Sequence, residues 1–148
     1  MGHHQLNLFD LQDKVAVVTG AGRGIGRGIS IALAEAGANV VLAARRKETL
    51  DEVAAIVEKN GGRALVVPTD VLENDQLDRL VAQTMEAFGG IDILINNAGG
   101  SIPGKQASFT ADGFELTFGT NHLGHFLLTN LLREDLSPIE QARGFSDL

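Results

Sequence analysis

The stretch KVAVVTGAGRGIG, residues 14–26, decides the fold. Its first six residues form a compact β-branched run, which favours a strand buried on both faces. Glycines then fill every second position from Gly20 to Gly26, and helical periodicity begins at Ile25. A strand, a tight glycine turn and a helix N-terminus in this order direct free backbone N–H groups and the positive end of the helix dipole toward an anion.

The glycines of this loop have different expected roles. Gly20 takes the positive φ of a tight turn, Gly24 lets the backbone approach a pyrophosphate, and Gly26 lets the helix pack close to the strand. Their spacing is G-x-x-x-G-x-G, so a strict G-x-G-x-x-G cannot be placed on them. No Gly-Lys-Ser/Thr follows, which excludes a P-loop. A glycine-rich turn without a ligand is the alternative, and the strand–turn–helix context disfavours it.

Outward from this loop, short apolar runs alternate with helical patterns. We expect strands at residues 14–19, 39–43, 63–67 and 91–95, and helices at residues 25–36, 49–59, 72–88 and about 110–132. The first helix shows an apolar stripe at Ile25, Ile29, Ala32, Leu33 and Ala36. Such alternation predicts a Rossmann-type, doubly wound parallel sheet in the order 3-2-1-4, with helices on both faces in three α/β/α layers.

Three motifs in this order resemble the short-chain dehydrogenase/reductase family. Residues 19–26 match its T-G-x-x-x-G-I-G, residues 96–99 match its N-N-A-G, and residues 121–124 resemble its N-x-x-G. The resemblance covers about residues 11–132. It implies an oxidoreductase that transfers a hydride between a nicotinamide cofactor and an alcohol or carbonyl.

The resemblance and the loop chemistry together give a set of cofactor-binding residues. These are Thr19, Gly20, Gly22, Arg23, Gly24, Ile25, Gly26, Arg45, Arg46, Asp70, Val71, Asn97, Ala98 and Gly99. Asp70 and the N–H of Val71 would bind the adenine, although Asp70 also suits a helix N-cap. Asn97, Ala98 and Gly99 would line the adenosine ribose, although Asn and Gly are also common turn residues.

The end of the second strand indicates which nicotinamide cofactor binds. NAD enzymes place an acid there, whereas residues 43–47 read AARRK. Arginine suits bidentate contact with a phosphate, and Arg23 adds a further positive charge. Two charge-assisted bonds to a 2′-phosphate, at about 1.5–3 kcal/mol each, would favour NADP by roughly 10²–10⁴. We therefore expect NADP rather than NAD, with a solvated turn as the alternative for residues 45–47.

The chain carries little of the family's catalytic set. Asn121 matches the family Asn that holds a water near the active Lys, but the sequence has no Tyr and its last Lys is Lys105. Residues 133–148 lack the fifth strand that would end in the family Ser, so neither Ser137 nor Ser146 takes that role. We expect residues 1–148 to form a single incomplete NAD(P)-binding domain with a divergent tail over residues 133–148. We expect this domain to be inactive alone, because the family Tyr and Lys that would transfer the proton are absent.

Composition excludes several other classes of protein. The chain has no cysteine, which rules out a disulfide scaffold and thiolate metal sites. A net charge of −7 without a basic stripe argues against nucleic acid. No apolar run suggests a membrane span or signal peptide, so a cytoplasmic location is expected. The adjacent His3 and His4 lack a third ligand, and His122 and His125 lack a carboxylate, so no metal site is expected.

Two other functions remain open at this point: a non-catalytic nucleotide-binding or interaction module, and a non-functional truncated product. In the family the long fourth helix often takes part in dimerisation. Without further strands, the fourth strand would be a bare sheet edge, and the fourth helix would expose Leu123, Phe126, Leu127 and Leu131. The expected partners are therefore a nicotinamide dinucleotide and a second copy of the chain bound through this helix.

Overall fold

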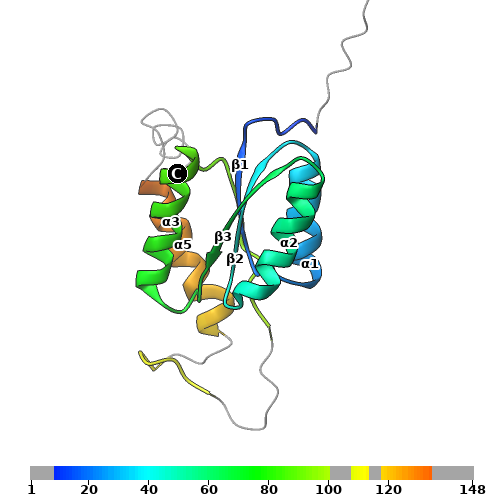
Figure 1. Cartoon of the computed structure of the whole chain (residues 1–148). Helices are drawn as coiled ribbons and strands as arrows, with labels where there is room; N and C mark the ends of the chain where they lie inside the picture. The colour runs from blue at the N-terminus through cyan, green and yellow to red at the C-terminus, as the bar shows by residue number, and fades with distance from the viewer. Residues whose placement is uncertain (1–8, 101–107, 114–117, 135–148) are drawn as a thin grey trace, which may run out of the picture.

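A four-stranded parallel sheet in the order β3-β2-β1-β4 forms the centre of the computed structural model, which describes residues 9–100, 108–113 and 118–134. Helices α1 and α2 cover one face of the sheet, and α3 and α5 cover the other (Figure 1). The elements are β1 (Val15–Thr19), α1 (Gly24–Glu35), β2 (Asn39–Ala44), α2 (Lys47–Lys59), β3 (Arg63–Pro68), α3 (Asn74–Phe88), β4 (Ile93–Ile95), a π-helical turn η1 (Gly119–Leu123) and α5 (Gly124–Glu134). This arrangement confirms the predicted Rossmann-type sheet and its strand order.

The two middle strands are apolar on both sides because each side faces a helical layer. In β1, Val15 and Val17 belong to the core beneath α3 and α5, whereas Ala16 and Val18 belong to the core beneath α1 and α2. The parallel register pairs Val17 with Val41 on one side and with Leu94 on the other. All four strands therefore end at the same edge of the sheet, and their following loops meet there.

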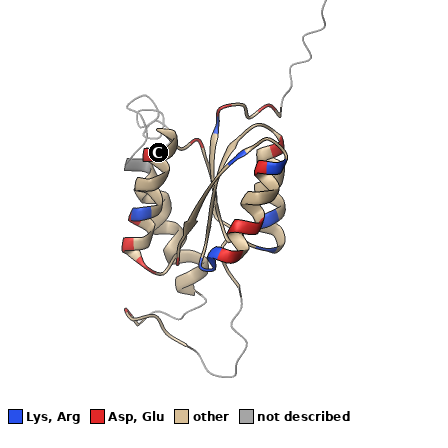
Figure 2. Cartoon of the chain, viewed as in Figure 1, with Lys and Arg blue, Asp and Glu red and all other residues tan. Residues whose placement is uncertain are grey.

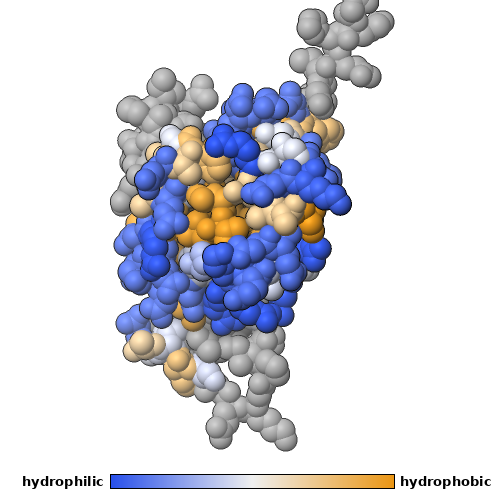
Figure 3. All heavy atoms as spheres, in the orientation of Figure 1, coloured by the Kyte–Doolittle hydropathy of each residue, from blue (hydrophilic) through white to orange (hydrophobic). Residues whose placement is uncertain are grey.

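Strand β3 is an edge of the sheet within the described residues. Figure 3 shows apolar surface gathered in the middle of this face, over β3, with hydrophilic residues on the helices at either side. Leu65 and Val66 are partly buried there, and the Arg63 guanidinium lies 5.1 Å from the centre of the Phe88 ring. Charged residues lie mainly on the helices and in the connecting loops (Figure 2). None of the helices described is both long enough and apolar enough to cross a membrane.

Helix α1 buries only part of its predicted apolar stripe, because Ile29 and Leu33 pack partly against the core beneath α1 and α2 while two other members are exposed. Ile25 is 75% exposed and Ala32 is exposed, while Gly26 and Ser30 are buried. A Cβ at Gly26 would lie 2.1 Å from the carbonyl oxygen of Gly20, so the helix has room for no side chain there. The Ser30 hydroxyl donates to the Gly26 carbonyl at 2.7 Å. The helix therefore packs most closely at its small residues Gly26 and Ser30, and Ile25 is left exposed at its start.

The predicted fourth helix is wrong at its start. Thr110 and Gly113 belong to a turn, closed by a 3.0 Å bond from the Gly113 N–H to the Thr110 carbonyl; residues 114–117 lie outside the described residues. The helix then opens with the wide turn η1. Of the residues expected to be exposed, Phe126 is 61% exposed, but Leu127 and Leu131 pack partly against the core. Leu123 is likewise only partly exposed.

Candidate functional site

The loops that follow the four strands enclose a cleft of about 950 Å³. The loop after β1 leads to α1 on one face of the sheet, and the loop after β4 leads toward α5 on the other. The cleft lies between them, at the point where the strand order reverses, which is where open α/β sheets bind ligands. Its volume is in the range of small-molecule and cofactor sites.

Of the fourteen predicted cofactor-binding residues, all but Thr19 and Gly26 line this cleft. Seven further lining residues were not predicted: Ala43, Ala44, Thr49, Thr69, Leu72, Gly100 and Thr120. Most of these directly adjoin a predicted residue at a strand end, so extending each motif by one residue would have identified them from the sequence. Thr49 and Thr120 carry no such signal, because each reaches the cleft from the first turn of a helix.

Thr19 lies behind the cleft and is fully buried. Its hydroxyl oxygen accepts the backbone N–H of Asn97 at 3.0 Å and that of Ala98 at 2.9 Å. It also lies 2.9 Å from Nε2 of His125. The residue expected at the cofactor therefore joins β1 to the loop after β4.

Asn97 strengthens the same junction from the other side. Its side-chain amide donates to the carbonyl of Thr19 at 3.2 Å and to that of Gly20 at 3.3 Å. A Cβ at Gly26 would also come within 2.5 Å of this amide nitrogen. The glycine loop, the start of α1 and the loop after β4 are thus packed as one unit.

The glycine loop has the backbone geometry of an anion site. Gly20 and Gly24 have φ values of 66° and 56°, a region that residues with a side chain rarely adopt. Helix α1 begins at Gly24, and its N-cap residue Arg23 makes no side-chain capping bond. The first N–H groups of the helix are therefore available to bind an anion in the cleft.

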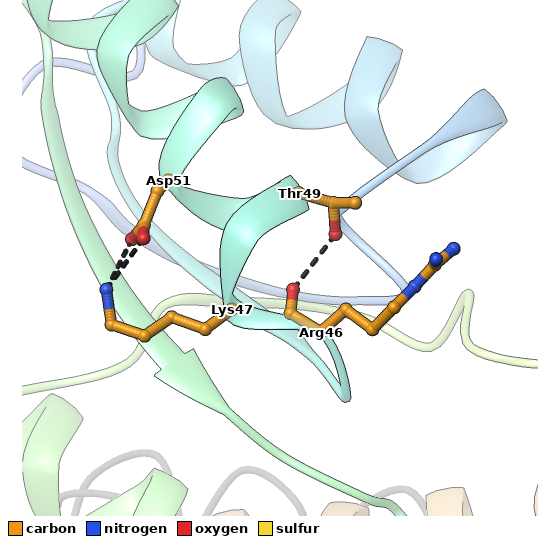
Figure 4. A network of polar contacts seen from close by, with 4 residues as sticks. All are labelled: Arg46, Lys47, Thr49 and Asp51. Atoms are coloured by element: carbon orange, nitrogen blue, oxygen red, sulfur yellow. Dashed lines mark hydrogen bonds and ion pairs between the residues drawn. The ribbon is translucent and has the colours of Figure 1, made fainter.

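Three arginines line the cleft: Arg23, Arg45 and Arg46. All three are exposed, and neither of the two ion pairs found in the described part of the chain involves them. The neighbouring Lys47 instead donates to both carboxylate oxygens of Asp51 at 2.7 and 2.8 Å (Figure 4). The arginines give the cleft a local positive charge in a chain of net charge −7.

Asp70 lines the cleft, and it is not the N-cap of α3. That helix begins at Asn74 after Glu73, whose side chain makes no capping bond. Asp70 Oδ1 instead accepts the N–H of Leu72 at 3.0 Å, and the Asp70 N–H donates to Oε1 of Gln76 at 2.8 Å. The helix-cap alternative is therefore wrong, and Asp70 stabilises the turn ahead of the helix.

Asn121 lies in η1, beside the cleft rather than in its lining. Its Oδ1 accepts the N–H of Gly100 at 3.0 Å, and its Nδ2 donates to the carbonyl of the same residue at 3.2 Å. A side chain at Gly99 would also collide with it, since a Cβ there would lie 2.6 Å from Oδ1. Asn121 therefore fixes the loop after β4 to the helix.

Closely packed glycines lie at both ends of the π-turn. A Cβ on Gly119 would lie 3.3 Å from the Leu72 side chain, and one on Gly124 would lie 2.3 Å from the carbonyl oxygen of Val71. These glycines are five positions apart, a spacing that a turn wider than an α-helix brings onto one face. π-turns are frequent at functional sites, and this one carries Asn121.

Two of the histidines, His122 and His125, lie in the described part of the chain. Within the described ranges, no group of three or more His, Cys, Asp or Glu is arranged to hold a metal ion. His122 stacks on the Phe118 ring, with 5.1 Å between ring centres. His125 is buried, and this burial lowers the pKa of its ring below the usual 6.5. His3, His4, Ser137 and Ser146 lie outside the described residues.

Comparison with known proteins agrees with this geometry. The family model for short chain dehydrogenases matches residues 14–144. The chain is 42% identical over 121 residues to an uncharacterized oxidoreductase of Mycobacterium tuberculosis, covering 79% of this chain and 46% of that protein. It is 43% identical over 126 residues to a fatty acyl-CoA reductase of Acinetobacter baylyi, covering 83% and 43%.

Solved structures give the same result. A short-chain type dehydrogenase/reductase from Mycobacterium marinum superposes with a TM-score of 0.75 at 37% identity, covering 87% of this chain and 52% of that one. A 7α-hydroxysteroid dehydrogenase in complex with NADH and 7-oxo glycochenodeoxycholic acid superposes with a TM-score of 0.76 at 32% identity, covering 86% and 51%. The chain spans about half the length of the curated relatives it matches. The fold, the three motifs and the family match agree that this chain belongs to the short chain dehydrogenase family.

Proposed function

We propose that this chain binds NADP(H) in the cleft and is the cofactor-binding part of an oxidoreductase that transfers a hydride between nicotinamide and an alcohol or carbonyl. The observation that supports it most is the set of three arginines, Arg23, Arg45 and Arg46, beside an uncapped helix N-terminus. Lining residues of β2 and its loop include no carboxylate that would accept from a ribose 2′-hydroxyl. Both features suit a ligand that carries a pyrophosphate and a further phosphate.

The cleft residues divide by the part of the dinucleotide that each would bind. The N–H groups at the start of α1 would hold the pyrophosphate, and the arginines would hold the 2′-phosphate. Asp70 and Val71 would bind the adenine, and Asn97, Ala98 and Gly99 would line the adenosine ribose. Gly100 and Thr120 would then lie nearer the nicotinamide, because they line the cleft on the side of η1.

The chain's own part in the reaction would be to bind and orient the cofactor. Bound nicotinamide supplies or accepts the hydride, and a neighbouring acid or base must move a proton. The sequence has no tyrosine and no lysine after Lys105 to do this. Asn121, whose side chain is bonded to Gly100, cannot do it alone. We therefore expect these 148 residues to bind NADP(H) without turning over a carbonyl substrate.

A calorimetric titration with NADP⁺ and NAD⁺ tests the cofactor. Arg45→Gln is expected to weaken NADP⁺ binding about tenfold or more, because a charge-assisted contact of about 1.5–3 kcal/mol is lost, and to leave NAD⁺ binding unchanged. Lys47→Gln is the matched control: it removes the same charge two residues away, but from a side chain paired with Asp51 outside the cleft lining. Equal affinity of the unmodified chain for both cofactors, or an equal effect of Arg45→Gln on both, would contradict the NADP preference.

We propose further that two copies of the chain associate through η1 and α5. Phe126 on α5 and Phe118, directly ahead of η1, are exposed. Such aromatic side chains are common in homodimer interfaces. We expect sedimentation to show a dimer that Phe126→Ser converts to a monomer, while Phe9→Ser, which changes an exposed phenylalanine ahead of β1, leaves the dimer intact. A monomer in the unmodified chain would contradict this assignment.

A further inference from the structure

The Thr19 hydroxyl has four groups within hydrogen-bond distance, but it has only one hydrogen to donate. It lies within hydrogen-bond distance of the N–H groups of Asn97 and Ala98, of His125 Nε2 at 2.9 Å, and of the Ile95 carbonyl at 3.3 Å. The two N–H groups can only donate, so they occupy both acceptor positions of the hydroxyl oxygen. Its single hydrogen must then go either to His125 or to Ile95.

The other ring nitrogen of His125 decides between these two. Nδ1 lies 3.3 Å from the carbonyl oxygen of Asn121, which can only accept, so Nδ1 carries a hydrogen. In a neutral ring Nε2 is then an acceptor, and it takes the Thr19 hydrogen at the shorter of the two distances. In this arrangement the hydroxyl and both ring nitrogens all have partners, in agreement with the lack of any unpartnered buried side-chain N or O atom among the described residues.

A protonated ring does not fit this arrangement. Its Nε2–H would point at a hydroxyl oxygen whose acceptor positions are already taken by Asn97 and Ala98. Among the described residues, no opposing charge is found at the ring: β1 and the loop after β4 contribute Thr19 and Asn97, and α5 contributes Thr129, which donates to the His125 carbonyl. The charged residues of α3, which packs against α5, are exposed. His122, in the adjoining turn η1, is exposed and stacks on Phe118. Across the loop after β3, the Asp70 carboxylate accepts from Leu72.

We propose that His125, neutral and protonated on Nδ1, is a positioning residue of the nucleotide cleft. It orients the Thr19 hydroxyl to accept both Asn97 and Ala98, and so holds the loop after β4 against the glycine loop. This inference rests on the proposed function only for its effect on nucleotide binding. Protonating His125 releases the junction and loosens the cleft.

The pH dependence follows from the lowered pKa of the buried ring. The folded chain holds this proton less tightly than the unfolded chain, in which the pKa is the ordinary 6.5. Stability from the junction is therefore complete above about pH 6.5 and falls as the pH drops from there toward the folded pKa. Nucleotide affinity is expected to fall at lower pH than this, as the pH passes through the folded pKa, because only there does the ring of the folded chain become protonated and the cleft loosen.

The first test is NMR of the ring nitrogens of His125 in the full chain without nucleotide. We expect the Nδ1–H tautomer near neutral pH and a ring that titrates below 6.5. An Nε2–H tautomer, or titration at or above 6.5, overturns the proposal. This measurement needs no nucleotide. It therefore tests the role of His125 even if the proposed function is wrong and no dinucleotide binds.

The second test is calorimetry with NAD⁺ and NADP⁺ between about pH 5 and pH 8. A loss of affinity in acid shared by both cofactors reports His125, whereas a loss for NADP⁺ alone reports its 2′-phosphate, which titrates near pH 6 as other phosphate monoesters do. His125→Gln, which keeps an acceptor and does not titrate, is expected to bind within about threefold of the unmodified chain and to lose the shared pH dependence. His125→Leu is expected to bind about tenfold more weakly at every pH, as for one lost hydrogen bond.

His122→Gln, the matched control on the exposed neighbouring histidine, is expected to keep the unmodified pH profile. If His125→Gln keeps the shared pH dependence instead, or if His122→Gln removes it, His125 is not the group that controls the cleft.

Discussion

A Gly26→Ala variant is expected to lose nucleotide binding and about 3 kcal/mol of its free energy of unfolding. The added Cβ would lie 2.1 Å from the Gly20 carbonyl oxygen and 2.5 Å from the Asn97 side-chain amide. The Gly20 oxygen belongs to backbone that cannot rotate away, so α1 must move off β1 and the bonds of Asn97 to Thr19 and Gly20 must lengthen. Overpacking of this kind costs about 1–3 kcal/mol, and the disrupted hydrogen bonds add to it.

Gly28→Ala provides the control in the same helix. Nothing lies within 4 Å of a Cβ at Gly28, and alanine is a better helix former than glycine, so this variant is expected to gain about 0.5–1 kcal/mol. Urea denaturation of both variants, with calorimetry using NADP⁺, measures the two effects. A Gly26→Ala chain as stable as the Gly28→Ala chain would show that α1 does not pack on Gly20 as described.

A Thr19→Val variant is expected to be destabilised by about 3 kcal/mol or more, although valine has nearly the shape of threonine. The change leaves three groups without a partner: the N–H groups of Asn97 and Ala98, and Nε2 of His125. Each buried group left unpaired costs about 1–3 kcal/mol. The loop after β4 is then held to β1 mainly by the Asn97 side chain, so nucleotide binding is expected to weaken as well.

Thr84→Val is the matched control for this change. Thr84 is as buried as Thr19, but its hydroxyl only donates to the Leu80 carbonyl one turn earlier in α3. Its replacement is expected to cost less than about 1 kcal/mol, because no donor is left unpaired. Hydrogen exchange at the Asn97 and Ala98 amides gives a local measurement, since both are expected to exchange faster in Thr19→Val and to be unchanged in Thr84→Val. Equal stability of the two variants would mean that Thr19 is an ordinary core residue.

The order of apolar runs and helical patterns was sufficient to predict the sheet, because β-branched strands buried on both faces and right-handed connections leave few arrangements. The packed face of α1 was predictable only in part, since Ile29 and Leu33 of the expected stripe pack against the core but Ile25 does not. The stripe that includes Ile25 follows hydrophobicity alone, whereas the packed face is decided by a contact between Gly26 and a carbonyl oxygen of another segment. The start of the last helix was not predictable either, because Gly119 and Gly124 are closely packed against residues outside the helix, among them Leu72 and Val71.

Parts of the candidate site could have been interpreted better from sequence. Thr19 alternates with Val15 and Val17, so strand geometry points its side chain toward the α3 and α5 layer and away from the glycine loop. Lys47 and Asp51 are four residues apart on a helix, the spacing of an ion pair. The contact between Thr19 and His125 could not be anticipated, because it joins residues 106 positions apart that no motif connects.

The Thr19 junction has a consequence for the order in which the chain folds. It joins Thr19 to Asn97, 78 positions away, so a long loop must close before either wall of the cleft can take shape. We infer that local βα units form early and that the cleft is completed in the last steps. A nucleotide would then bind only chains that have finished folding. It would slow unfolding with little effect on the folding rate, so that its presence extends the lifetime of the native chain.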